Sequence, residues 1–181
     1  LTQQNTLVRF NSDAPGVLLG PAVPITGFTG ARMLGIDRRP ATGQIYGIDT
    51  DDTLYLINPT TGVATAVGTP NSIPNSDNGV GFDFNPLVDR IRLINNDNQN
   101  LRINPNDGTF VADTATTVDA SGAAYSNNFL GAISTTLYDI SDVTNALYIQ
   151  DPPNAGAMTL VGPLGVDISQ VNGFDIFGFD N

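Results

Sequence analysis

Aspartate is the residue type in this sequence that offers the most chemistry. The chain has eighteen acidic residues, all of them Asp, and seven basic residues, all of them Arg. Three aspartates recur in one short phrase: Gly35-Ile-Asp37, Gly81-Phe-Asp83 and Gly173-Phe-Asp175. Carboxylates repeated around a common axis could form a ring that binds Ca²⁺, which takes about six to eight oxygen ligands. Alternatively, each Asp accepts hydrogen bonds from turn amides or from an arginine such as Arg38 or Arg90. We favour this second interpretation, because a structural bond repeated in every unit needs no ligand.

The residue types that are missing exclude most catalytic mechanisms. The chain has no His, Cys, Lys or Glu, so a general base could only be Asp, Tyr or the α-amino group. Zinc and copper sites built on His or Cys are excluded. A glycosidase can use two Asp alone, but no pair stands out among the eighteen. We therefore predict that the protein is not an enzyme.

Two other groups of residues have a chemical and a structural interpretation. The turns Asp49-Thr-Asp51-Asp52 and Asn95-Asn-Asp97-Asn-Gln-Asn100 resemble calcium loops but lack the spacing and terminal Glu of an EF-hand. Asp and Asn are also ordinary turn residues, so no cofactor is predicted, with Ca²⁺ as the alternative. The five tyrosines could stack against a glycan, but their positions within strands favour packing between repeats. These are Tyr46, Tyr55, Tyr125, Tyr138 and Tyr148.

The phrases that carry these residues repeat along the chain. Leu54-Tyr-Leu-Ile-Asn58-Pro59-Thr-Thr-Gly62 returns as Leu101-Arg-Ile-Asn104-Pro105-Asn-Asp-Gly108 and as Leu147-Tyr-Ile-Gln150, with a weaker copy from Leu7. The four leucines, at 7, 54, 101 and 147, are 47, 47 and 46 residues apart. A unit of about 40–50 residues with four short strands is typical of a β-propeller blade.

Short runs of β-branched and aromatic residues, broken by Gly, Pro, Asn and Asp, predict the strands of each unit. The expected strands of three units are Met33–Asp37, Gln44–Asp49, Thr53–Ile57 and Val63–Val67; Val80–Phe84, Arg90–Ile94, Leu101–Ile103 and Thr109–Ala112; and Ala123–Ser126, Thr135–Ile140, Ala146–Ile149 and Met158–Val161. We predict an all-β fold, a small β-propeller of about four blades, each a four-stranded antiparallel meander. The chain is one domain over 1–181, with repeats at about 1–30, 31–78, 79–121 and 122–171 and a closing strand at 172–181.

The two ends of the chain hold complementary parts of one further blade. Leu1–Gln4 matches half of a second strand, Thr6–Phe10 a third and Val17–Ile25 a fourth, whereas Gly173–Phe179 matches a first strand. We expect this blade to be built from both ends of the chain or completed by a neighbouring subunit. Because the sequence begins partway through the strand pattern of a blade, we also expect a leader or upstream residues before it. The expected assembly edge consists of Leu1, Thr2, Gln3, Gln4, Phe174, Ile176 and Phe179.

Charge and hydropathy limit the partners. The formal net charge of −11 argues against nucleic acid, whose phosphates need a basic face. The sequence has no apolar run near the ~18 residues of a membrane span.

Several phrases resemble a bacterial secreted family, the domain of unknown function 4394. They include Gly35-Ile-Asp-Arg-Arg-Pro, Gly81-Phe-Asp-Phe-Asn-Pro, Gln150-Asp-Pro-Pro-Asn and Val161-Gly-Pro-Leu-Gly. The resemblance covers nearly the whole chain and implies a propeller-like fold and export from the cell, but no activity. The resemblance implies a further blade after Gly173-Phe-Asp-Ile, and we expect that this blade is either lost or replaced by something else.

These observations lead to a prediction of a secreted, extracellular structural protein that binds copies of itself. An unpaired strand edge is a template for a strand from another copy, and a head-to-tail contact that does not close propagates as a filament or layer. The alternative is a monomeric secreted β-propeller that binds a glycan, a cation or a protein.

Overall fold

The computed structural model describes residues 1–74 and 79–178, and in these ranges the fold is all-β. Apart from strands and turns it contains one short 3₁₀ helix, η1 (Pro153–Ala155). The described residues include no helix long and apolar enough to cross a membrane.

Three four-stranded antiparallel sheets make up most of the molecule. The first contains β5 (Met33–Arg38), β6 (Ile45–Asp49), β7 (Leu54–Ile57) and β8 (Ala64–Val67). The second contains β9 (Val80–Asn85), β10 (Arg90–Asn95), β11 (Asn100–Ile103) and β12 (Phe110–Ala112). The third contains β13 (Gly122–Tyr125), β14 (Leu137–Ser141), β15 (Ala146–Gln150) and β16 (Met158–Pro163). In each sheet the strands pair in chain order, so the strands predicted for these three units are confirmed.

The fourth strand is the most exposed strand of each sheet. Strands β9 and β10 are almost entirely buried, because neighbouring sheets pack against both of their faces, whereas β12 is exposed along its length. One apolar cluster, which includes Phe84 and Leu93, fills the space between the first two sheets. A smaller cluster around Tyr125 and Leu137 lies between the second and third sheets. Stacking of sheets, rather than any single sheet, therefore creates the core.

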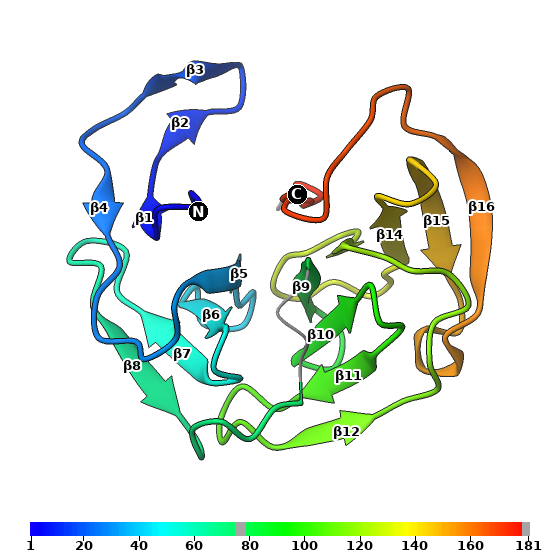
Figure 1. Ribbon diagram of the computed structural model, residues 1–181, viewed down its shortest axis with the longest axis horizontal. Helices are drawn as coiled ribbons and strands as arrows, with labels where there is room; N and C mark the ends of the chain where they lie inside the picture. Colours follow the sequence, from blue (N-terminus) through cyan, green and yellow to red (C-terminus); the bar gives the residue numbers. More distant parts are fainter. Residues whose placement is uncertain (75–78, 179–181) are drawn as a thin grey trace.

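Figure 1 shows the sheets side by side along an arc, with the first strands β5, β9 and β13 toward its centre. The N-terminal strands lie at one end of this arc and the described C-terminal segment at the other, and the N-terminus lies near the centre.

The N-terminal unit differs from the prediction. It is a broken hairpin in which β1 (Thr6–Leu7) pairs with β4 (Val23–Pro24), and β2 (Phe10–Asn11) pairs with β3 (Ala14–Leu18). The half strand predicted at Leu1–Gln4 is wrong, because these residues form turn and irregular structure. The first strand predicted at Gly173–Phe179 is also absent from the described residues 173–178, and Phe179 lies outside them. Within the described residues neither segment pairs with another strand, and extended chain without such a ladder is not a strand.

Candidate functional site at the inner strands and the terminal segments

Glycines let the inner strands approach one another closely. A Cβ placed on Gly35 would lie 2.8 Å from the Cβ of Phe82, and one on Gly81 would lie 2.4 Å from the backbone nitrogen of Ala123. The same holds at Gly122, where a Cβ would lie 2.9 Å from Oδ1 of Asn172. The Gly of the repeated phrase therefore packs each inner strand against the next segment around the centre.

The Asp of the same phrase bonds one inner strand to the next. Oδ2 of Asp37 accepts a hydrogen bond from the backbone N–H of Phe84 at 2.8 Å, and Oδ2 of Asp83 accepts one from Tyr125 at 2.7 Å. We call these two interactions the inter-sheet bonds. They agree with the structural interpretation of the aspartates, although the donors are strand amides rather than turn amides or the side chains of Arg38 and Arg90; the backbone N–H of Arg38 also donates to Oδ1 of Asp37. At the equivalent position of β13 the residue is Ala124, so the described chain has no third bond of this kind.

The aspartates of the phrase lie close enough to affect one another's charge. Burial raises the pKa of Asp37 to about 6, against the effect of the amide hydrogen bonds, and the charge of Asp175 raises it further. Burial and then the charge of Asp37 raise the pKa of Asp83 well above its usual range. The two carboxyl groups lie close enough to influence each other, and the direction of the shifts favours the protonated form of Asp83. A neutral Asp83 removes the repulsion between the two neighbouring carboxyl groups.

No three acidic side chains within the described ranges lie in a geometry that could hold a metal ion. Calcium binding by Asp37, Asp83 and Asp175 stays an untested alternative. The residues of the calcium-like turns are used in other ways: Asp49 is fully buried and accepts hydrogen bonds from the amides of Gly30, Asp51 and Thr53. In the second turn, Oδ1 of Asn95 accepts from the amides of Asp97 and Gln99. Both residues therefore stabilise their turns.

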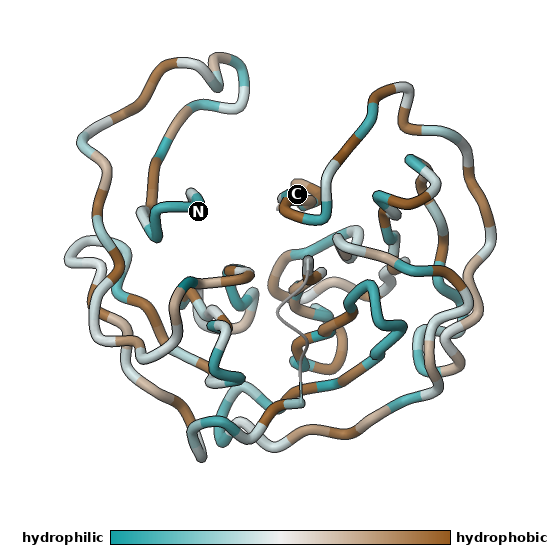
Figure 2. The backbone as a smooth tube through the Cα atoms, in the orientation of Figure 1, coloured by the Kyte–Doolittle hydropathy of each residue, from teal (hydrophilic) through white to brown (hydrophobic). Residues whose placement is uncertain are grey.

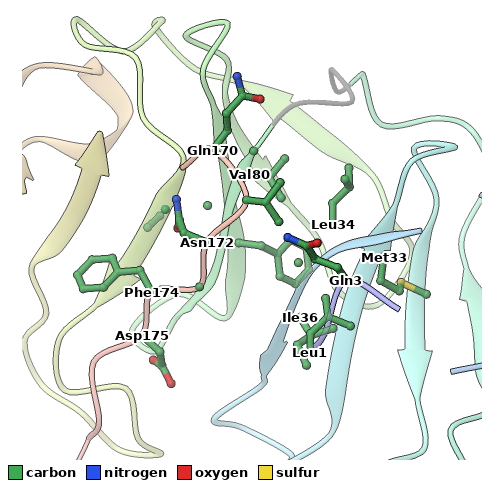
Figure 3. A pocket seen from close by; sticks show the side chains of 18 of the residues that line it. Leu1, Gln3, Met33, Leu34, Ile36, Val80, Gln170, Asn172, Phe174 and Asp175 are labelled. Atoms are coloured by element: carbon green, nitrogen blue, oxygen red, sulfur yellow. The ribbon is translucent and has the colours of Figure 1, made fainter. Parts of the chain in front are cut away.

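A central cavity of about 610 Å³ lies between the inner strands and the two terminal segments. Figure 3 shows side chains that line it from the N-terminal residues, β5, β9 and residues 170–175. Of the predicted assembly edge, Leu1, Thr2, Gln3 and Phe174 line this cavity, as does Asp175. Gln4 and Ile176 do not line it, and Phe179 lies outside the described residues. The structure thus brings parts of both terminal segments to one space.

The hairpin formed by β2 and β3, which we call the ribbon, is exposed on both faces. Every residue from 9 to 19 is exposed. The apolar side chains among them are Phe10 (49 % exposed), Val17 (64 %), Leu18 (49 %) and Leu19 (65 %). Figure 2 shows this hydrophobic stretch along the outer side of the N-terminal hairpin. At its base Leu7 and Ile25 are buried in an apolar cluster with residues of the first sheet, so only the ribbon projects.

Residues 171–178 have the burial pattern of a strand without being one. Asn172, Phe174, Ile176 and Gly178 are half-buried, and the residues that alternate with them are exposed. The side chain of Asn172 anchors the segment by donating a hydrogen bond of 2.8 Å to Oγ of Ser121, just before β13. Period-two burial means that one face packs against the third sheet and the other is available. The segment is in the position of an inner strand that follows β13.

Sequence reasoning placed the assembly edge at the termini and missed the ribbon. The available signal was the run Val17-Leu18-Leu19, three consecutive apolar residues in a strand predicted to be outermost. Among the tyrosines, Tyr46, Tyr55, Tyr125 and Tyr148 are buried, which supports packing over glycan stacking.

The fold and these contacts define an all-β repeat protein in which neighbouring four-stranded antiparallel sheets are joined through glycine contacts and aspartate–amide bonds. The model of the domain of unknown function DUF4394 matches residues 6–181, and the chain belongs to this family. A search among curated proteins finds no match.

Proposed function

We propose that the protein is a secreted, non-enzymatic structural subunit that assembles with copies of itself into an extracellular filament or surface layer. Each subunit is a propeller of about four blades, and one blade is completed across the boundary between two copies. The observation that carries this proposal is the ribbon, a two-stranded hairpin exposed on both faces and rich in apolar side chains.

An isolated two-stranded hairpin is at best marginally stable in water. The ribbon also presents free strand edges and a patch of four large apolar side chains, features that mark interaction surfaces on folded proteins. It occupies the third and fourth strand positions of a blade, and within the described chain nothing pairs with it as a first or second strand. A partner that adds strands there would bury the apolar side chains of the ribbon and pair the free backbone N–H and C=O groups along its edges.

A second copy of this chain is the partner that fits. Residues 171–178 repeat the opening phrase of a blade and present an exposed face with strand periodicity. Residues 171–178 would supply the first strand that the ribbon lacks. The ribbon would supply the third and fourth strands that residues 171–178 lack. Pairing between different surfaces of two copies is heterologous, so it extends into a polymer unless the rotation closes a ring. The extracellular location rests on the resemblance to a secreted family.

The test compares two substitutions of one residue type at equal exposure. Val17 in the ribbon is 64 % exposed, and Val143, in the turn between β14 and β15, is 65 % exposed. We expect wild-type protein to form polymers visible by electron microscopy and fast-sedimenting species in ultracentrifugation. Val17→Asp should shift the population to monomers, because a charge would be buried in the contact, and Val143→Asp should assemble like the wild type.

Equal assembly of the two variants would rule out the ribbon as the contact. A wild-type protein that stays monomeric at all concentrations would reject self-assembly and favour the alternative, a monomeric binding module whose ligand enters a cavity of the propeller.

A further inference from the structure

A second cavity, of about 390 Å³, lies between the second and third sheets and is lined by three of the seven arginines. Arg90, Arg92 and Arg102 come from β10 and β11. The remaining walls are Asn85, Val88, Ile91, Tyr125, Pro152, Pro153 and Asn154. Such a concentration of positive charge is unexpected in a chain with a net charge of −11.

The sheet repeat provides an internal comparison that shows what these arginines replace. In the second sheet Arg92 lies opposite Asp83 and Arg102. The equivalent pair is Tyr46 and Leu56 in the first sheet, and Tyr138 and Ile149 in the third. The fold is built twice without a charge at these positions, so the arginines are not needed to form a sheet of this type.

Arg92 is held rigidly at the base of the cavity, with its Nε, Nη1 and Nη2 all engaged in hydrogen bonds. Its side chain is 2 % exposed, and it donates hydrogen bonds to Oδ1 of Asn100 (2.6 Å), Oδ2 of Asp113 (2.8 Å) and Oδ1 of Asn154 (2.8 Å). Fixing a guanidinium group in this way removes the conformational entropy that a ligand contact would otherwise cost. The polar partners therefore preorganise the cavity.

The acidic groups beside the arginines do not balance their charge. Asp113 accepts bonds from both Arg92 and Arg102, so one carboxylate serves two guanidinium groups. Arg90 donates only to the backbone oxygen of Asp89 within the described residues. Asp139, which is buried near Arg92, has its pKa raised to about 8 by burial and is neutral at pH 7. Asp107 lies near Arg90 but is exposed, Asp89 pairs with Arg39, and burial raises the pKa of Asp83, which lies opposite Arg92. The three arginines therefore keep a surplus of positive charge, and Arg90 and Arg102 keep unused N–H donors.

We propose that this arginine cavity binds the carboxylate of a small sugar acid, a hexuronic acid or a molecule of that size. Guanidinium groups recognise carboxylates through paired N–H donors. Tyr125 and the two prolines supply apolar walls, and the side-chain amides of Asn85 and Asn154 are suited to ring hydroxyls. A volume of about 390 Å³ is near the lower end of the range for small-molecule sites, roughly 300–1,000 Å³, and accommodates one ring. This site is separate from the ribbon and does not depend on self-assembly.

The experiment is calorimetric titration of the intact protein with galacturonate, galactose and sulfate at pH 7. We expect galacturonate to bind and neutral galactose not to bind. Arg90→Gln should weaken galacturonate binding about tenfold, because one charge-assisted hydrogen bond is lost. Arg38→Gln changes the net charge equally at an exposed site in the first sheet and should leave the affinity unchanged.

Three results would each overturn the proposal: galactose that binds as tightly as galacturonate, sulfate that binds as tightly as galacturonate, or equal effects of the two substitutions. Nuclear magnetic resonance of the arginine Nε–H groups in the wild type is independent of any variant. Galacturonate should shift the signals of Arg92 and Arg102, and unchanged signals at saturating concentration would also overturn the proposal.

Discussion

At the scale of single residues, the buried carboxyl group of Asp139 is the most unusual feature of the core. Its side chain is fully buried on β14, and neither carboxyl oxygen has a hydrogen-bond partner among the described residues. Burial raises its pKa to about 8, and the neighbouring charge of Arg92 only partly offsets this effect. The folded protein therefore holds a proton on Asp139 that the unfolded chain, with a pKa near 3.9, has lost at neutral pH.

The raised pKa of Asp139 predicts that the free energy of unfolding falls as the pH rises between about 4 and 8. The unfolded chain binds fewer protons in this window, so this group contributes a loss of at most about 1.4 kcal/mol per pH unit. Asp139→Asn keeps the shape and removes the titration. Urea unfolding at pH 5, 6, 7 and 8 should show a flatter dependence in this variant, with the residual slope due to Asp37 and Asp83. An identical slope in the two proteins would show that Asp139 is ionised when folded.

At the scale of elements, the inner strands are joined by a glycine contact and a carboxylate–amide bond. The glycine contact is closest at Gly81, where an added Cβ would meet backbone and side-chain atoms of Ala123 at 2.4 and 2.6 Å. Backbone at this distance cannot move aside as a flexible side chain can, so β9 and β13 would have to separate.

Gly81→Ala should therefore destabilise the protein by about 1–3 kcal/mol, as overpacking does. Gly162→Ala, in β16, is the matched control, because no atom lies within 4 Å of the position that an added Cβ would take and its backbone conformation suits any residue. This second substitution should be neutral or slightly stabilising. Denaturant titration of both variants measures the difference, and equal stabilities would mean that the inner strands are not tightly packed.

Much of this element structure could be predicted from the sequence. The 47-residue spacing of Leu54 and Leu101, with turn residues at Asn58 and Asn104, was sufficient to place the strands of three sheets. The donors to Asp37 and Asp83 could not be predicted, because Phe84 and Tyr125 come close only when separate repeats stack. Leu1–Gln4 and residues 173–178 have strand-like sequences, but a strand also needs a neighbour with which to pair. The arginine cavity was missed because its three arginines alternate with apolar residues, as surface residues of a strand also do.

At the scale of the whole molecule, an acidic surface acts against contact between copies. Each subunit has a formal net charge of −11, and the exposed ribbon carries four large apolar side chains. The proposed contact thus depends on apolar burial and strand pairing, while the long-range force between copies is repulsive.

Salt should therefore strengthen association, because the screening length shortens to about 10 Å at 0.1 M ionic strength. Sedimentation at 10 mM and 300 mM NaCl, at one protein concentration, should show larger species at the higher salt. Association that weakens with salt would instead indicate ion pairs between copies, and would contradict an apolar contact at the ribbon.

In each inter-sheet bond the acceptor residue precedes the donor residue in the sequence. This order affects how the sheets can fold while the chain is being synthesised. Asp37 bonds to Phe84, and Asp83 bonds to Tyr125, so each acceptor is made more than forty residues before its donor. At about 5–20 residues per second, an inner-strand carboxylate waits some seconds on the ribosome until the next repeat emerges. Each completed sheet then offers a ready acceptor to the one that follows. The chain can fold sheet by sheet from its N-terminal side, with each new sheet docking on a finished one.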